Sequence, residues 1–149
     1  MKTYKTLIPE ITLKYKSGTE FKHKITSSKD AYDVFIRFFD QDVFELTESV
    51  IVLFLNGANN TIGWMKHSQG GSYQTIIDVK LIVGTALKCN ASAIMVSHNH
   101  PSGNIRPSRE DEIITRKITE GCNFFNIKLL DHIISTTEGY YSFSDEGKL

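Results

Sequence analysis

The residues best suited to chemistry lie between positions 97 and 111, in the string SHNHPSGNIRPSRED. His98 and His100 are separated by one residue, and Asp111 follows eleven residues after His100. On extended backbone, side chains two residues apart project to the same side. Two imidazoles and one carboxylate suit Zn²⁺, and three protein ligands leave a fourth position for water, as in catalytic zinc sites. Because zinc lowers the pKa of such a water to about 7, the segment predicts a hydrolytic metal centre.

The elements that must position these residues alternate between strands and helices. Continuous apolar runs are typical of strands buried on both faces, and apolar residues at helical spacing predict amphipathic helices. We predict strands at 49–55, 61–67, 91–97, 126–135 and 140–143, and helices at 28–40, 77–89 and from Ser108 to near Gly121. The strand at 61–67 returns antiparallel, and the histidines fall in a loop at 98–107. This alternation predicts an α/β fold with a mixed central β-sheet flanked by helices.

The first part of the chain differs from the rest in its pattern. Residues 10–16 and 19–25 alternate apolar and polar side chains on either side of Ser17-Gly18, which predicts a β-hairpin or two edge strands. We therefore predict a short strand-rich lead at 1–27 that belongs to the same domain as 28–149. A length of 149 residues is typical of one domain, and it can bury a core without help from a metal.

Composition excludes several classes of function. Lys plus Arg equals Asp plus Glu, at 17 each, so the chain lacks the overall positive charge typical of nucleic-acid-binding domains. Its two cysteines, Cys89 and Cys122, are far apart and predict free thiols in a reducing compartment. No apolar segment follows the first five residues, and no apolar run approaches 18 residues. We expect a cytoplasmic protein that does not span a membrane.

The pattern of histidines, serine and aspartate matches a known family. His-x-His, seven residues, Ser, two residues and Asp is the JAMM motif of the MPN-domain metallopeptidases, and here it falls on His98, His100, Ser108 and Asp111. The longer string HNHPSGNIRPSREDE, with LLDHII at 129–134 and YYSF at 140–143, resembles the RadC branch of that family. The resemblance covers roughly 28–149. It implies the MPN architecture, which is similar to that of the cytidine deaminases, with Zn²⁺ on the two histidines and the aspartate.

The resemblance also implies a mechanism and two further residues. The family uses an upstream glutamate as general base, and this maps to Glu48, directly before the strand at 49–55. Glu45 is its rival, because both precede the apolar run. Ser108 is implied to donate a hydrogen bond to the developing oxyanion. The reaction implied is cleavage of a peptide or isopeptide bond by a zinc-bound water, whereas the sequence indicates neither the substrate protein nor an oligomeric state.

Other interpretations of the same residues stay open. Asp111 can serve as an acid favoured at a helix N-terminus, and Ser108 as a plain N-cap. His132 is expected to support the metal site or the fold rather than to be a ligand. The whole domain can be a non-catalytic MPN-like binding module, linked to DNA repair or DNA binding as the RadC label implies. A nucleobase deaminase is disfavoured, because its H-x-E and P-C-x-x-C signature is absent.

Overall fold

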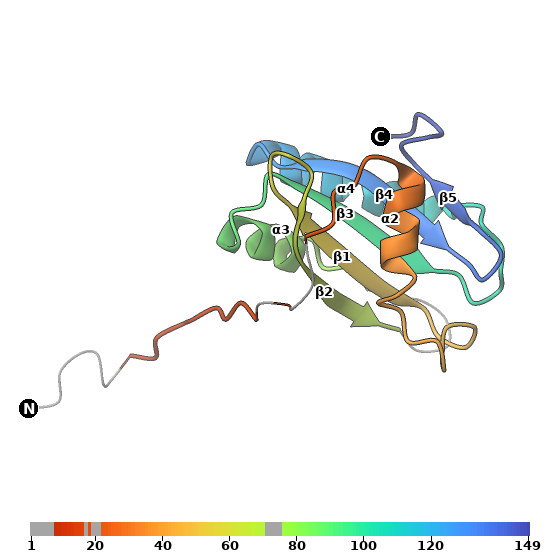
Figure 1. The fold of residues 1–149 in the computed structure, drawn as a ribbon, viewed down its shortest axis with the longest axis horizontal. Helices are drawn as coiled ribbons and strands as arrows, with labels where there is room; N and C mark the ends of the chain where they lie inside the picture. Colours follow the sequence, from red (N-terminus) through yellow and green to blue (C-terminus); the bar gives the residue numbers. More distant parts are fainter. Residues whose placement is uncertain (1–7, 17, 19–21, 71–75) are drawn as a thin grey trace, which may run out of the picture.

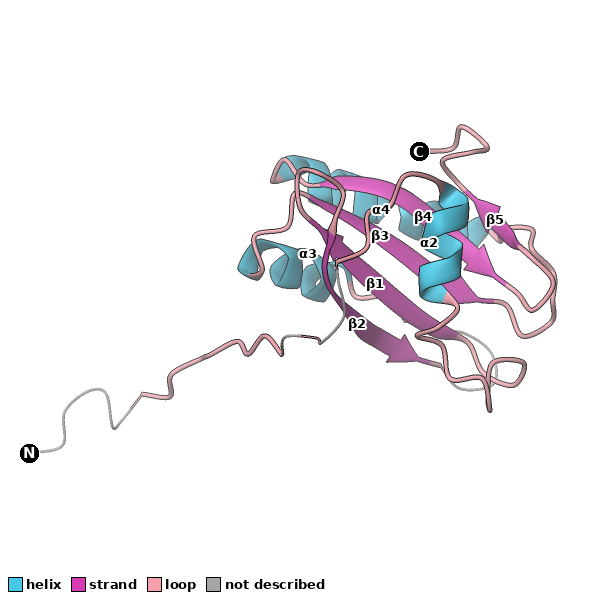
Figure 2. Cartoon of the chain, in the orientation of Figure 1, coloured by secondary structure: helices cyan, strands magenta, loops and turns pink. Residues whose placement is uncertain are grey.

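The computed structural model describes residues 8–16, 18, 22–70 and 76–149. A five-stranded sheet in the order β2-β1-β3-β4-β5 lies between helix α2 on one face and helices α3 and α4 on the other (Figures 1 and 2). The strands are β1 Ser49–Leu55, β2 Thr61–Gln69, β3 Ala93–Asn99, β4 Lys128–Ser135 and β5 Tyr140–Ser142. The helices are α2 Ser28–Phe35, α3 Val79–Lys88 and α4 Arg109–Phe124. The predicted α/β fold with a mixed sheet is confirmed.

The sheet is mixed because two connections cross over through helices, α3 between β2 and β3 and α4 between β3 and β4, while the connections from β1 to β2 and from β4 to β5 turn back. Strands β1 and β2 pair antiparallel, as do β1 and β3, and β4 and β5. Strands β3 and β4 pair parallel, and α4 forms the crossover between them that a parallel pair requires. The start of α4 therefore lies beside the end of β3, and this is where the chain places its histidines and Asp111.

The continuous apolar run of β1 is explained by burial on both faces of the sheet. Val50, Val52 and Phe54 belong to the core cluster formed with α3 and α4, whereas the alternate residues of β1 belong to the cluster formed with α2. Strand β3 follows the same alternation, with Ile94 and Val96 on the side of α3 and α4. Since neither face meets water, no polar alternation marks these strands in the sequence.

Element boundaries differ from the predictions where local hydrogen bonds decide them. Helix α2 ends at Phe35 instead of 40, because the next amides make tighter bonds, from Arg37 N to Val34 O and from Phe38 N to Phe35 O. Helix α3 begins at Val79, since the Asp78 side chain caps it by accepting from Leu81 N. Helix α4 passes Gly121 and ends at Phe124. A side chain at Gly121 would meet Val79 at 3.2 Å, so this glycine serves close helix packing rather than helix termination.

The predicted N-terminal hairpin is wrong for the residues that the structure describes. Residues 10–16 form no strand, and 19–21 lie outside the described residues. The apolar side chains Ile11 and Leu13 are exposed, so the alternation has no face to bury. One bridge joins Lys24 to Asn60, and Tyr15 donates a hydrogen bond to Ile62 O at 2.9 Å. Among the described helices, none has the length and apolar character needed to cross a membrane.

Candidate metal centre

The two histidines and the aspartate converge where β3 ends and α4 begins. The structure extends β3 to Asn99, because β1 and β4 pair with it on both sides, so His98 is a strand residue and not part of the predicted loop. His98 continues the alternation of Ile94 and Val96 towards α4 and is 1% exposed. His100 follows on the same side, and Asp111 lies in the first turn of α4.

The three side chains present their ligand atoms to a common point. His98 Nε2 lies 2.9 Å from His100 Nε2 and 3.2 Å from Asp111 Oδ1, and His100 Nε2 lies 3.5 Å from Asp111 Oδ2. Tetrahedral coordination with bonds of about 2.0–2.2 Å separates two ligand atoms by roughly 3.3–3.6 Å. The observed spacings are close to that range. The cluster can therefore hold one metal ion, with each residue contributing one ligand atom.

The second nitrogen of His100 is held in a way that favours metal binding. His100 Nδ1 donates to the carbonyl oxygen of Asn104 at 2.5 Å. A carbonyl oxygen can only accept, so Nδ1 carries the hydrogen and Nε2 presents its lone pair to the cluster. The loop that supplies this carbonyl turns at Gly103, whose positive φ of 77° suits glycine, and Gly103 N donates back to His100 O. Such partners fix the orientation of metal-binding histidines.

Asp111 has two roles at the start of α4. Ser108 Oγ accepts from Asp111 N at 3.1 Å, while Ser108 N donates to Asp111 Oδ2 at 2.7 Å, which together form a capping box. Burial alone would raise the pKa of Asp111, but the close approach of His100 and His98 and the hydrogen bond from the Ser108 amide outweigh it. The pKa therefore lies well below its usual range, and the carboxylate is ionised. The capping role and a ligand role are compatible.

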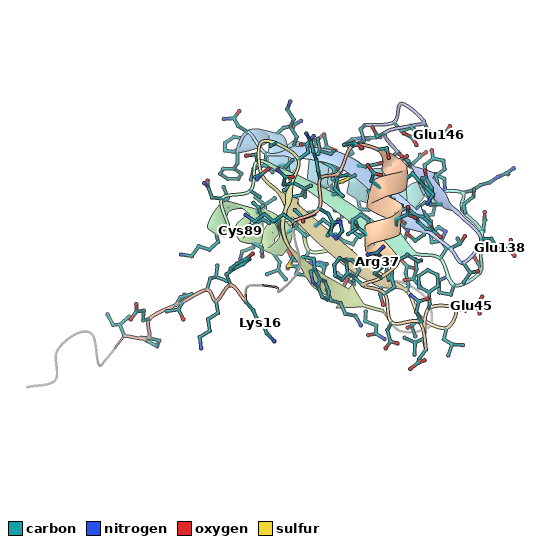
Figure 3. All side chains as sticks on the ribbon, in the orientation of Figure 1. Lys16, Arg37, Glu45, Cys89, Glu138 and Glu146 are labelled. Atoms are coloured by element: carbon teal, nitrogen blue, oxygen red, sulfur yellow. The ribbon has the colours of Figure 1, made fainter. Side chains whose placement is uncertain are left out.

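Glu48 lies beside this cluster, and Glu45 does not share its position. The antiparallel register pairs Val50 with His98. Because side chains two residues apart share a face, Glu48 lies on the face of Val50, next to the histidines. Burial raises the pKa of Glu48, and its proximity to His98 and His100 opposes that rise. Glu45 is exposed on the loop between α2 and β1 (Figure 3).

Asn99, the residue between the two histidines, fixes the segment that carries Glu48. It is fully buried on the opposite side of β3 from the histidines. Its Nδ2 donates to Phe44 O at 2.6 Å and to Thr47 O at 2.9 Å, while its Oδ1 accepts from Ser49 N at 2.7 Å. Because Thr47 and Ser49 flank Glu48 in the sequence, these hydrogen bonds hold the backbone on either side of Glu48. The sequence pattern places Asn99 in the loop 98–107 and gives it no role, whereas the structure shows it buried at the end of β3 with every side-chain polar atom bonded.

His132 lies behind His98 and makes no direct contribution to the three-residue cluster. Its Nε2 is 2.8 Å from His98 Nδ1, and its Nδ1 is 2.6 Å from Thr115 Oγ1. Burial lowers the pKa of His132 well below its usual value, and the nearby His98 lowers it further. The sequence indicated His132 as a supporting residue but gave no role to Thr115. The available signal was that Thr115 lies one helical turn after Asp111, on the same face of the helix.

Comparison with known proteins agrees with this geometry. The family description "RadC-like JAB domain" matches residues 25–148. A UPF0758 protein of Flavobacterium johnsoniae is 43% identical over 125 residues, which cover 83% of this chain and 53% of that protein. A UPF0758 protein of Thermotoga maritima is 35% identical over 126 residues, which cover 85% and 55%. The chain spans about half the length of these curated relatives. It belongs to the RadC-like JAB domain family.

Proposed function

We propose that this domain is a zinc-dependent hydrolase of the JAMM metallopeptidase type that cleaves a peptide or isopeptide bond. The observation that carries the proposal is the convergence of His98 Nε2, His100 Nε2 and the Asp111 carboxylate within 4.8 Å of one another. Two imidazoles and a carboxylate are the ligand set of catalytic zinc sites, which keep a fourth position for water or substrate. The JAB family to which the chain belongs includes metallopeptidases.

The residues around the cluster suit amide hydrolysis. When bound, zinc polarises a carbonyl oxygen and lowers the pKa of a coordinated water to about 7. Glu48, half-buried beside the histidines, accepts a proton from the attacking water and passes it to the leaving nitrogen. Ser108 Oγ uses a lone pair to cap α4, so its hydroxyl hydrogen remains to be donated to the oxygen that becomes negative. We also place the protein in the cytoplasm, since free thiols at Cys89 and Cys122 suit a reducing compartment.

A panel of peptide and isopeptide substrates tests this proposal with metal removal as the switch. We expect slow or no cleavage by protein treated with a chelator, and recovery after one equivalent of Zn²⁺ is added. His100→Ala, which removes one ligand, should not recover. Cleavage that is equal before and after chelation, or that persists in His100→Ala, contradicts the proposal.

A second candidate function is binding of single-stranded nucleic acid, and one groove favours it. A groove of about 1050 Å³ lies along β2 between α2, α3 and residues 13–16 and 18. Of its lining residues, Figure 3 labels Lys16, Arg37 and Cys89. Phe38 and Trp64 stack there at 4.3 Å between ring centroids, and Trp64 is 48% exposed. Among the described lining residues none is acidic, and five are basic: Lys14, Lys16, Lys22, Arg37 and Lys88. The groove is therefore locally positive although the net charge of the chain is zero. Aromatic rings in a basic groove are typical of proteins that bind single-stranded nucleic acid.

A salt titration with a fluorescent oligonucleotide decides this second candidate. We expect micromolar binding that weakens steeply as salt rises. Replacing Trp64 by alanine should weaken binding by about 1–3 kcal/mol, the value of one stacked base. Phe124→Ala, which removes an exposed aromatic side chain at the end of α4, serves as the control. Absence of binding at low salt, or equal loss in both variants, excludes this groove as the site.

A further inference from the structure

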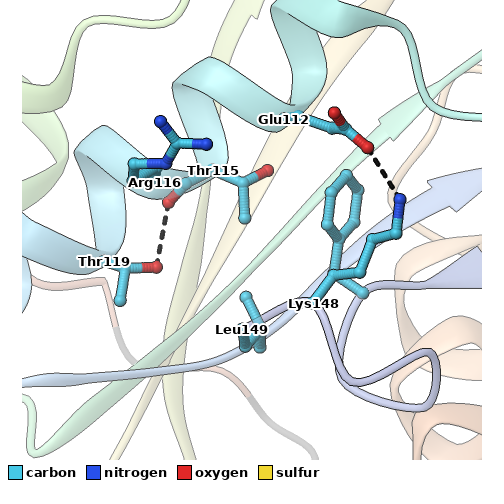
Figure 4. A pocket seen from close by; sticks show the side chains of 7 residues that line it. Glu112, Thr115, Arg116, Thr119, Lys148 and Leu149 are labelled. Atoms are coloured by element: carbon cyan, nitrogen blue, oxygen red, sulfur yellow. Dashed lines mark hydrogen bonds and ion pairs between the residues drawn. The ribbon is translucent and has the colours of Figure 1, made fainter.

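His132 lies in the middle of β4 and is not one of the three candidate metal ligands. Its ring is fully buried and stacks on Phe143, with centroids 5.1 Å apart and planes 12° apart. It stays buried although its neighbours Thr115 and Phe143 line a shallow pocket of about 400 Å³ at the surface (Figure 4). Burial and stacking fix the orientation of the ring. Each of its two nitrogens contacts one polar group, His98 Nδ1 or Thr115 Oγ1.

The directions of these hydrogen bonds follow from one carbonyl oxygen. Thr115 Oγ1 lies 2.6 Å from Asp111 O, one helical turn earlier, and a carbonyl oxygen only accepts. The hydroxyl hydrogen of Thr115 is therefore committed to Asp111. Thr115 Oγ1 must then accept from His132, which places the hydrogen of His132 on Nδ1.

The remaining nitrogen of His132 sets the tautomer of His98. A buried imidazole whose nitrogens face a hydroxyl and another imidazole, rather than a carboxylate, is neutral. A neutral ring with its hydrogen on Nδ1 can only accept at Nε2, and so His98 must donate from its Nδ1. The hydrogen of His98 is then on the far side from the cluster. Its Nε2 keeps the lone pair that a metal needs.

We propose that Thr115 and His132 are positioning residues that hold His98 in its metal-binding tautomer. The chain of hydrogen bonds starts at the backbone of Asp111 and ends at His98, so two of the three cluster residues are joined through the protein interior. Reversing the chain would place a hydrogen on His98 Nε2, where it would block coordination. The inference rests on the proposed metal site, but it does not depend on the reaction that the site performs.

Matched substitutions at Thr115 test this positioning role. Thr115→Val keeps the shape of the side chain and removes the acceptor, whereas Thr115→Ser keeps the hydroxyl. We expect Zn²⁺ affinity, measured by competition with a chromophoric chelator, to fall roughly 10-fold in the valine variant and to stay near wild type in the serine variant. His132→Phe keeps the stacking on Phe143 and removes both nitrogens, and its affinity should fall by about 10–100-fold without loss of melting temperature. Equal affinities in wild type, Thr115→Val and His132→Phe would overturn the proposal.

The nitrogen spectrum of the histidine rings supplies a result that a merely structural role would not give. In protein with ¹⁵N-labelled histidine and bound zinc, we expect the hydrogen of His132 on Nδ1 and none on Nε2. A hydrogen on His132 Nε2 overturns the inference. Zinc binding without cleavage of any substrate would contradict the proposed hydrolase and leave the positioning role standing, while a wild-type protein that binds no zinc would overturn both.

Discussion

Replacing Glu48 by glutamine is expected to lower cleavage by about 10²–10⁴-fold while zinc content stays unchanged. Glutamine keeps the size of the side chain in this half-buried position but cannot accept a proton. Glu48 lies near the cluster without belonging to the three residues that converge on one point. The substitution therefore separates proton transfer from metal binding. The measurements are the initial rate of cleavage and metal content by elemental analysis on the same preparation.

Glu45→Gln is the matched control for this experiment. The Glu45→Gln substitution makes the same chemical change three residues earlier, at an exposed position of the same loop. We expect its rate to stay within about twofold of wild type, as a solvated surface carboxylate has no access to the reacting atoms. If Glu45→Gln lost activity and Glu48→Gln kept it, the assignment of the general base would be wrong.

Replacing Asn99 by alanine is expected to lower the free energy of unfolding by roughly 3 kcal/mol. The substitution removes the side chain that bonds three backbone groups. These are the carbonyl oxygens of Phe44 and Thr47 and the amide of Ser49. For a chain of this length the loss corresponds to a fall in melting temperature of roughly 6–12 °C. Because these bonds also hold the segment around Glu48, the rate of cleavage should fall more than zinc affinity does.

Thermal unfolding followed by circular dichroism measures the effect, with Asn123→Ala as the control. Asn123 is exposed on α4, so its replacement should shift the melting temperature by no more than a degree or two. A melting temperature of Asn99→Ala within that same margin would show that the three hydrogen bonds contribute nothing to stability, and it would contradict the structural role given to this residue.

The candidate site was predictable where its residues are close in sequence. His98, His100 and Asp111 lie within one strand end, one loop and one helix start, so their spacing alone brings them to one side of the chain. Glu48 could not be separated from Glu45 by sequence, because the choice depends on the register between β1 and β3. Once Val50 is known to face His98, the alternation of the strand selects Glu48. The partners of Asn99 lie about 50 residues away in sequence, and no local pattern reveals them.

The fold was predictable where burial imposes a pattern and less so elsewhere. Apolar runs identified β1 and β3 because both faces of these strands are buried. The alternation at 10–16 led to a wrong strand, since period two indicates a strand only if one face finds a core. Helix ends depended on single side chains, such as the Asp78 cap of α3 and the close approach of Gly121 to Val79. Tertiary contacts of this kind override local propensity.

The metal content of wild type, His98→Ala and His23→Ala, each purified without added metal and then supplied with zinc, is the direct test of the proposed metal site. His23 is an exposed histidine outside the cluster, so its variant controls for the loss of a histidine in general. If the three residues hold the metal, wild type and His23→Ala each contain about one zinc per chain, and His98→Ala contains none. Wild-type protein that takes up no zinc, or His98→Ala that retains it, would contradict the proposed metal site.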